Sequence, residues 1–257
     1  QARLFWQSQT MIEQNHIIAA FRFELTRVQT VAVRQRVVSL LRNVDETLAN
    51  KVAQSLGFAT PEPAPLASDL PIPSYEISPP LSLLSRPGVK GIRTRRIAIL
   101  VANGVKAATI TTLYTEFLLS GAVPRLVASR LGTVQADDGS VLDVEVSIEA
   151  MPSVLYDAVV IPGATACIET LAADAQALEF IREQYRHCKA ILVLGDAQAL
   201  FAAAGIPGVL PNGEDDPAIV IADEHENENA LNIAIDSFKV ALSAHKLYER
   251  EVDPPIV

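Results

Sequence analysis

Two cysteines are the residues of this chain best suited to covalent chemistry. Cys167 follows the turn Pro162-Gly163-Ala164-Thr165 and could stand near a helix start, where the pKa of a thiol is lowered. We favour a structural role for Cys167, as a small buried side chain at a loop–helix junction. Cys188 follows His187 at the end of an expected helix. Adjacent residues point to different faces, so this pair is a poor catalytic or metal-ligating set.

Two polar segments could bind a metal or a phosphate. Asp223-Glu-His225-Glu-Asn-Glu228 offers ligands for a hard metal, but it lacks the spaced glycine and ligand alternation of a calcium loop. We interpret it as a solvated charged loop. Asn103-Gly104-Val105-Lys106-Ala107-Ala108-Thr109 follows an apolar strand pattern without the spacing of a Walker or dinucleotide motif. We expect an ordinary turn there, and neither a metal nor a cofactor held by this chain.

Composition and charge limit the classes of protein to which this chain can belong. The chain has 257 residues, 49% of them hydrophobic and 20% charged, which is typical of a globular protein with one or two cores. We find no apolar run long enough for a membrane helix and no secretory signal, and two cysteines are too few for a disulfide framework. We therefore expect a cytoplasmic protein. The chain does not begin with Met, which fits a fragment or a processed product.

The charge is unevenly spread. Residues 1–57 carry seven basic and four acidic groups, a net +3, whereas residues 94–257 carry eleven and twenty-three, a net −12. Nucleic-acid binding needs clustered Lys and Arg, so an acidic domain argues against a nucleic-acid partner. No membrane partner is expected either.

From residue 94 onward, apolar strand patterns alternate with helix patterns. We expect strands at 96–102, 124–128, 156–161, 190–194 and 219–221, and helices at about 109–120, 174–187 and 230–250, with a short one ending at 204. Asp138-Gly139 within residues 132–146 indicates a β-hairpin. This order predicts an α/β domain over residues 94–257, with a parallel, doubly wound sheet and right-handed crossovers.

Residues 1–57 predict a small all-helical segment. Thr10 with Glu13 forms a capping-box pattern, and apolar residues then recur on one helix face, at Ile17, Phe21, Leu25 and Val28. A second helix is expected at about 31–41. A third should begin with a capping box at Asn43 and Glu46 and stop at Gly57. His16 shares a face with Ala20 and Phe23, which favours a packed or capped histidine. Helices this short make a thin core, so we expect them to pack on something larger.

Residues 58–93 predict an extended, proline-rich linker. Proline removes a backbone donor and fixes φ, so neither a helix nor a central strand can persist there. The prolines of this stretch are Pro61, Pro63, Pro65, Pro71, Pro73, Pro79, Pro80 and Pro87.

The opening segment resembles the closing helices of the haem domain of monofunctional catalases. The resemblance rests on Gln1-Ala-Arg-Leu-Phe-Trp6, then Glu13-Gln-Asn-His16-Ile, then Ala20-Phe-Arg-Phe-Glu-Leu25. The later α/β region resembles the flavodoxin-like tail of large-subunit catalases. Together they imply the C-terminal part of a cytoplasmic haem homotetramer that dismutates hydrogen peroxide to water and oxygen. The resemblance places the haem and its ligands in sequence before Gln1, and makes the haem domain and neighbouring subunits the partners.

The α/β region also resembles the class I glutamine amidotransferase-like (ThiJ/PfpI) superfamily, through the turn Val159-Val-Ile-Pro-Gly-Ala-Thr165 and the strand that ends in Leu194-Gly195-Asp196. Enzymes of that superfamily carry a cysteine at a nucleophile elbow there. Leu194 occupies that position and cannot attack a carbonyl. The supporting acid falls near Thr109, and residues 205–212 hold no histidine. The resemblance therefore implies a vestigial elbow at Leu194, Gly195 and Asp196, with no catalytic residue.

Three hypotheses of different classes remain. The first is a structural part of a catalase that stabilises the fold and the oligomer and shapes access to the haem. The second is a chaperone-like holdase, which would bind unfolded client proteins through exposed apolar helix faces. The third, and least favoured, is a ThiJ/PfpI-like hydrolase or glyoxalase, which would require a reactive thiol.

Overall fold

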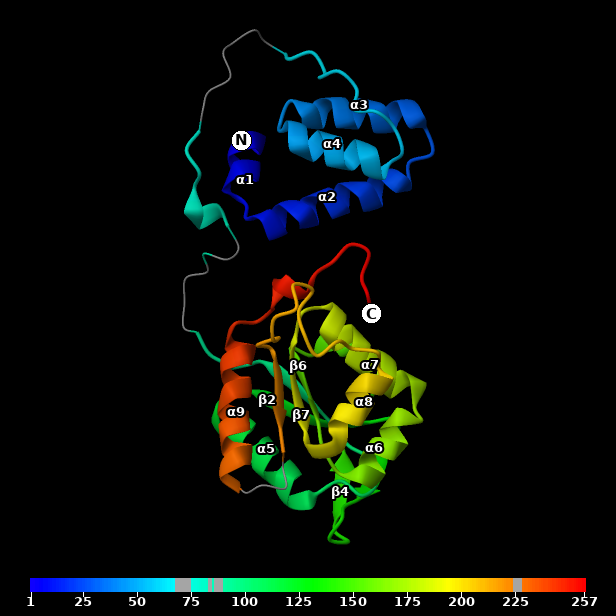
Figure 1. The fold of residues 1–257 in the computed structure, drawn as a ribbon, viewed down its shortest axis with the longest axis vertical. Helices are drawn as coiled ribbons and strands as arrows, with labels where there is room; N and C mark the ends of the chain where they lie inside the picture. The colour runs from blue at the N-terminus through cyan, green and yellow to red at the C-terminus, as the bar shows by residue number, and fades with distance from the viewer. Residues whose placement is uncertain (68–74, 83–84, 86–89, 224–227) are drawn as a thin grey trace. The chain divides into compact units, whose positions relative to one another are not determined.

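The computed structural model describes residues 1–67, 75–82, 85, 90–223 and 228–257. The chain divides into two compact units, Gln1–Gly88 and Val89–Val257. Figure 1 shows a helical unit in blue and cyan and an α/β unit from green to red.

The first unit is built from four helices around one small core. They are α1 (Ala2–Ser8), α2 (Met11–Thr26), α3 (Val31–Arg42) and α4 (Glu46–Ser55). Helices α3 and α4 lie side by side, as Figure 1 shows, and α2 packs against α4. The buried apolar side chains of this core are Trp6, Ile18, Leu25, Val38, Leu41, Leu48, Ala49, Val52 and Ala53.

The ends of these helices follow local capping rules. The expected capping box is present: the Glu13 amide donates to Thr10 Oγ1 over 3.4 Å, and the Thr10 amide donates to Glu13 Oε2 over 2.8 Å. Helix α4 ends just before Gly57, whose φ of +78° suits a glycine. Ile17, Phe21, Leu25 and Val28 all face the core, as the pattern predicts.

The predicted capping box at Asn43 is wrong. Asn43 has helical dihedrals, φ −73° and ψ −16°, and ends α3. An N-cap needs extended backbone, which Asp45 provides with φ −160° and ψ 138°, and Asp45 Oδ1 accepts from the Leu48 amide over 2.9 Å. The Asn43 side chain donates instead to the Ala64 carbonyl over 2.7 Å.

The beginning of the proline-rich segment and its residues 75–82 lie against the helices. Its beginning follows α3, where the Ala64 amide donates to the Ser39 carbonyl over 3.0 Å and Arg42 Nη1 donates to the Pro61 carbonyl over 3.1 Å. Residues 75–82 return to α1 and contain only the short 3₁₀ turn η1 (Pro79–Leu81). Pro71, Pro73 and Pro87 lie outside the described residues.

The second unit is a flavodoxin-like, doubly wound α/β domain, as predicted. Its six-stranded sheet has the order β5-β2-β1-β6-β7-β8, and all neighbouring pairs are parallel. The strands are β1 (Arg96–Leu100), β2 (Val123–Ala128), β5 (Val146–Ser147), β6 (Ala158–Ile161), β7 (Ala190–Leu194) and β8 (Ile219–Ala222). Every residue of β6 and β7 is buried, which is why these strands read as uninterrupted apolar runs.

Helices cover both faces of this sheet (Figure 1). Helices α5 (Ala107–Leu119) and α9 (Glu228–Ser243) lie on one face, where the rings of Phe117 and Phe238 are 5.5 Å apart. Helices α6 (Thr165–Ala172), α7 (Ala175–Arg186) and α8 (Gln198–Ala203) pack together on the other. The predicted hairpin is the antiparallel pair β3 (Gly132–Gln135) and β4 (Val141–Val144).

Two elements differ from the sequence prediction. Residues 165–172 form a separate helix, α6, which was not predicted because it is only eight residues long and follows a proline–glycine turn. The closing helix ends at Ser243 rather than near Arg250. His245 has a φ of +76°, which no helix tolerates, and the chain then forms the short turn η5 (Tyr248–Arg250). No helix among the described residues is long and apolar enough to cross a membrane.

Candidate functional site

The carboxyl edge of the sheet is the first place to look for a site. In an open parallel sheet, ligands bind where the chain order reverses, outside the carboxyl ends of the strands. Here the reversal lies at β1, which has β2 on one side and β6 on the other. The loops that border this point are residues 101–106 and 162–164.

These two loops leave little room between them. A Cβ atom at Gly104 would lie 2.7 Å from the Cβ of Ala166, the second residue of α6. The loop after β1 is also tied to the β3–β4 hairpin, because the Gly104 amide donates to the Gln135 carbonyl over 2.7 Å and the Gln135 amide donates to Asn103 Oδ1 over 2.9 Å. The Gly104 amide and the Asn103 side chain are thus engaged within the protein.

The elbow residues lie at this edge but do not form a nucleophilic site. Leu194 is the last residue of β7 and its side chain is fully buried. Gly195 follows with a φ of +52°, so the sharp turn of an elbow is present without a nucleophile. The exposed Asp196 accepts from the hydroxyl of Thr165 over 3.3 Å. Thr109, at the position of the superfamily's supporting acid, is a buried residue of α5.

The two cysteines are buried and far apart in the fold. Cys167 is the third residue of α6, with no exposed surface. Cys188 precedes β7 in a left-handed conformation, with a φ of +60°. Burial, reinforced by the nearby charge of Glu251, raises the pKa of the Cys188 thiol to about 12. At neutral pH this thiol stays protonated and is a poor nucleophile.

Where the structure describes them, the remaining polar candidates do not assemble into a metal site. Among the described residues, no three side chains of His, Cys, Asp or Glu gather closely enough to hold a metal ion. His225 and its neighbours at 224–227 lie outside the described residues. His16 is exposed on α2, so it is not a packed histidine; the core face of this helix turns away from position 16.

Three tyrosines of the α/β unit have raised pKa values, which bears on haem ligation. A tyrosine that ligates haem iron does so as a phenolate. Burial raises the pKa of Tyr156 to about 12, and burial also raises the pKa of Tyr185 and of Tyr114 above the usual value. A raised pKa makes the phenolate, and with it iron ligation, less favourable for these three side chains.

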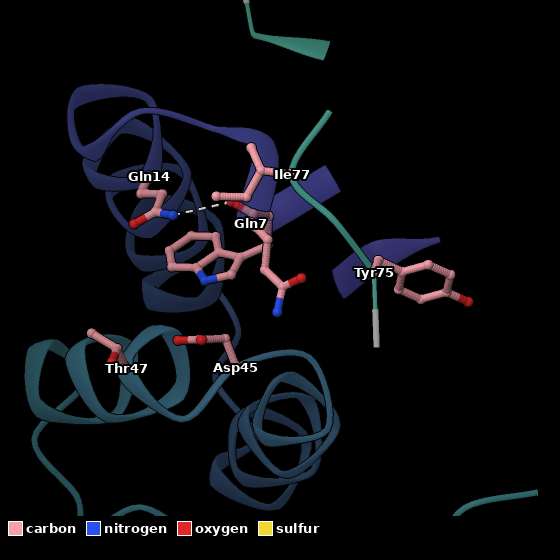
Figure 2. A pocket seen from close by; sticks show the side chains of 7 residues that line it. Gln7, Gln14, Asp45, Thr47, Tyr75 and Ile77 are labelled. Carbon is pink, nitrogen blue, oxygen red and sulfur yellow. Dashed lines mark hydrogen bonds between the residues drawn. The ribbon is translucent and has the colours of Figure 1, made fainter. Parts of the chain in front are cut away.

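The first unit contains a cleft of about 450 Å³ between α1, the start of α4 and residues 75–77. In Figure 2 the side chains of Gln7, Asp45 and Thr47 open onto the same space, whereas the Tyr75 ring points away from it. Gln14 closes one side by donating to the Trp6 carbonyl over 3.0 Å, the dashed bond of Figure 2. The cleft is shallow and holds no acid–base pair, so it suits a protein contact better than catalysis.

Three buried polar side chains beside this cleft were missed by the sequence reasoning. Ser8, Gln9 and Glu13 bind residues 78–82 of the proline-rich segment. Ser8 Oγ accepts from the Ser78 amide over 2.9 Å, and Glu13 Oε2 accepts from the Ser82 hydroxyl over 3.0 Å. The partners are about 70 residues apart in sequence, so no local pattern could have revealed them.

Comparison with known proteins places both units in one kind of protein. Residues 1–56 match a family model described as catalase-related, immune-responsive, and residues 93–251 match the C-terminal domain found in long catalases. The chain is 37% identical to catalase HPII of Pseudomonas putida over 254 residues, 98% of this chain and 33% of that protein. It is 37% identical to catalase HPII of Mycobacterium avium over 258 residues, and 31% identical to catalase-2 of Bacillus subtilis over 253 residues.

The alignments with the Mycobacterium avium and Bacillus subtilis proteins each cover 98% of this chain, but only 35% and 34% of those two proteins. The chain thus spans about one third of the length of the curated relatives that it matches. The match over residues 93–251 covers the whole sheet and all five of its described flanking helices. The chain therefore belongs to the family of C-terminal domains found in long catalases.

Proposed function

We propose that this chain serves as the C-terminal part of a long haem catalase, whose reaction is the dismutation of hydrogen peroxide to water and oxygen. In this role it supplies no haem ligand and no catalytic residue. It stabilises the fold and the homotetramer, and it shapes access to the haem held by the preceding domain. The order of the two family matches, catalase-related helices followed by the long-catalase domain, supports this reading. The two free cysteines fit the reducing cytoplasm.

The exposed apolar surface of the helical unit carries the structural role. Phe5, Met11, Phe23, Val31 and Leu40 each expose at least half of their surface, and Met11 exposes 77%. A four-helix unit with a core this small gains little stability from its own burial. Large apolar side chains exposed together on such a unit indicate a surface that packs against another protein surface.

The exposed Phe23 of this surface borders a hollow on α2. It measures about 530 Å³ and is lined by Ala19, Arg22, Phe23, Thr26, Arg27 and Ser55. The Arg27 guanidinium lies 4.0 Å from the centre of the Phe23 ring. Such a stacked pair beside a hollow is a common anchor in protein interfaces, where aromatic and arginine side chains dominate the binding energy. We propose that the haem domain fills this hollow.

The test compares the full-length catalase with a version that ends at Gly88. Removal of residues 89–257 should lower the midpoint of thermal inactivation and weaken the tetramer in light scattering, while the turnover per haem stays within about twofold, since no catalytic group is lost. A Phe23→Asp variant should weaken assembly in the same assays, with the exposed Leu119→Asp on α5 as the control. An unchanged tetramer and unchanged inactivation after truncation would refute the structural role.

The second candidate function is a holdase for unfolded proteins, favoured by the same exposed apolar side chains. Light scattering of a heat-denaturing client, with and without equimolar chain, tests it directly. Suppressed aggregation that is lost in Met11→Ser/Phe23→Ser would establish holding by this surface. Equal aggregation with and without the chain would exclude it.

Thiol catalysis is disfavoured, because Leu194 stands at the elbow and both cysteines are buried. We expect iodoacetamide to leave the native chain unmodified near neutral pH and to label both cysteines in denaturant, as intact mass spectrometry would show. Rapid native labelling of Cys167 would revive the enzyme hypothesis.

A further inference from the structure

A small, partly open cavity lies at the end of the sheet opposite to the vestigial elbow. It sits where β7 and β8 begin and α9 ends, and its volume is about 180 Å³. The catalase role does not use it. Its lining consists of Cys188, Ala190, Pro217, Ala218, Ser237, Val240, Ala241, Ala244, His245, Lys246 and Leu247.

The size and lining of the cavity suit the body of one small apolar molecule. Four alanines line it, and their short side chains leave the space between α9 and the sheet unfilled. An apolar cavity of roughly 150 Å³ engineered into another protein binds a single benzene ring. A cavity of 180 Å³ has room for one ring or a short branched chain. Its mostly apolar walls offer few hydrogen-bond partners to water.

The mouth of the cavity carries positive charge, although residues 94–257 have a net charge of −12. Lys246 lies at the mouth and, within the described part of the chain, forms no ion pair. His245 Nε2 lies 3.7 Å from Asp157 Oδ1, but Asp157 already accepts from Arg95 Nη1 over 3.0 Å. A carboxylate entering the mouth would therefore meet the Lys246 ammonium without first breaking another pair.

Other charged groups packed around the mouth compensate one another in part. Arg250 is paired with Asp216, and Glu251 lies 3.9 Å from the Cys188 sulfur. Lys189 is buried, with its ammonium 2.8 Å from the Ser153 carbonyl. Burial and then the charge of Lys246 lower the pKa of Lys189 to about 8, while the charges of Asp157 and Glu183 act in the opposite direction.

We propose that this cavity binds a small carboxylate with a one-ring or short branched apolar body, the body lying among the alanines and the carboxylate at Lys246. Removal of the apolar body from water makes the free energy of binding more favourable. The carboxylate also forms a charge-assisted contact with Lys246 that a neutral group of the same shape cannot form. In the simpler reading, Lys246 only complements the carbonyl end of α9. That reading predicts no preference for an anionic ligand.

The test is a titration of the complete chain with benzoate and, separately, with its neutral isostere benzamide, followed by amide chemical shifts. Saturable shifts should appear at Ala218 and Ala241, and benzoate should bind more tightly than benzamide. Lys246→Met should lower the affinity for benzoate about tenfold, which is the usual contribution of a hydrogen bond to a charged group. The affinity for benzamide should not change. Lys106→Met, at the other edge of the sheet, is the matched control and should change neither.

Filling the cavity gives an independent check. Ala241→Leu should abolish binding of both probes, and Ala244→Leu at the exposed rim serves the same purpose if the first variant fails to fold. The proposal is overturned if benzoate causes no saturable shift at these amides. Equal affinity for benzamide, or binding that survives the folded leucine variants, overturns it as well. None of these outcomes depends on catalase activity, so the proposal stands or fails separately from the proposed function.

Discussion

Arg250 and Asp216 form a fully buried, two-pronged ion pair that fastens the C-terminal segment to the sheet. The guanidinium donates through Nε and Nη2 to the two carboxylate oxygens, with a distance of 3.0 Å from Nη2 to Oδ1, and the side chains are 1% and 0% exposed. Arg250 Nη1 also donates to the Lys189 carbonyl over 2.6 Å, and the guanidinium lies 4.9 Å from the Tyr185 ring centre. Residues 244–257 are thereby tied to the strand that begins at Ala190.

Breaking this pair should be costly. Arg250→Met leaves the Asp216 carboxylate buried without its cation, so we expect the free energy of unfolding to fall by about 3–5 kcal/mol. Hydrogen exchange of the β7 amides measures this change, because the single tryptophan, Trp6, reports on the other unit. The exposed Glu179, whose carboxylate lies 3.7 Å from Arg182 in the same unit, is the control, and Glu179→Gln should cost less than about 1 kcal/mol. A loss below that level for Arg250→Met would show that the pair contributes little.

Lys189 should make stability depend on pH in the alkaline range. Its pKa is lowered to about 8 in the folded state, against 10.5 for the free side chain. Between these values the unfolded chain binds one proton more than the folded chain, so this residue's contribution to stability rises with pH from about 8 to 10.5. Lys189→Met should abolish that rise. Its effect is read as the difference between wild type and variant in urea unfolding at several pH values.

The comparison between wild type and variant is needed because the titration of other groups changes the stability in the opposite direction. The pKa values of Cys188 and Tyr156 are raised to about 12 by burial, so the unfolded chain loses those protons first and stability falls as pH rises above about 9. These contributions are shared by wild type and variant and cancel. If the stability of Lys189→Met relative to wild type is the same at pH 7.5 and pH 9.5, the lowered pKa is wrong.

Gly104 should be intolerant of any side chain. Its φ is +85°, and an added Cβ would lie 2.7 Å from the Cβ of Ala166. Gly104→Ala thus combines backbone strain with a clash, and we expect a loss of about 2–4 kcal/mol. Gly139, with a φ of +83° and open space around it, is a matched control, and Gly139→Ala should cost only about 1 kcal/mol. Thermal unfolding of the three proteins checks the order.

A second-site change separates the clash from the strain. Ala166→Gly removes the atom that Gly104→Ala would strike, so the double variant should recover part of the loss. Equal stability of the Gly104→Ala single and double variants would show that backbone strain alone is responsible.

Ser8 should control how firmly residues 75–82 lie against α1. Its hydroxyl accepts from the Ser78 amide over 2.9 Å while donating to the Leu4 carbonyl over 2.7 Å. In Ser8→Ala we expect amide exchange at Ser78 to accelerate by about tenfold, the cost of one partly buried hydrogen bond. Ser55→Ala is the matched control, because Ser55 also donates to the carbonyl four residues earlier but contacts no linker amide. Unchanged exchange at Ser78 would mean that other contacts hold the segment.

The amino-acid pattern was sufficient for features that depend on neighbours in sequence. The apolar runs of 158–161 and 190–194 predicted buried parallel strands, and Thr10 with Glu13 predicted a helix start that the structure confirms. Asn43 shows the limit of such patterns. Its residue type suits a cap, but the cap falls at Asp45 because the α3–α4 turn leaves Asn43 helical and Asp45 extended. Residue propensity identifies the residues that could cap a helix, and the backbone geometry decides which of them does so.

The sequence by itself determined the fold class, the family resemblance and the absence of a nucleophile at position 194, because each depends on residue type, order and local spacing. Only the tertiary structure decided which distant groups meet. It paired Arg250 with Asp216, 34 residues away, joined Ser8 to Ser78, and enclosed a cavity between α9 and two strand starts. Such contacts arise when packing brings together chain segments whose separation carries no periodic signal, so burial and charge at those positions follow from the fold as a whole.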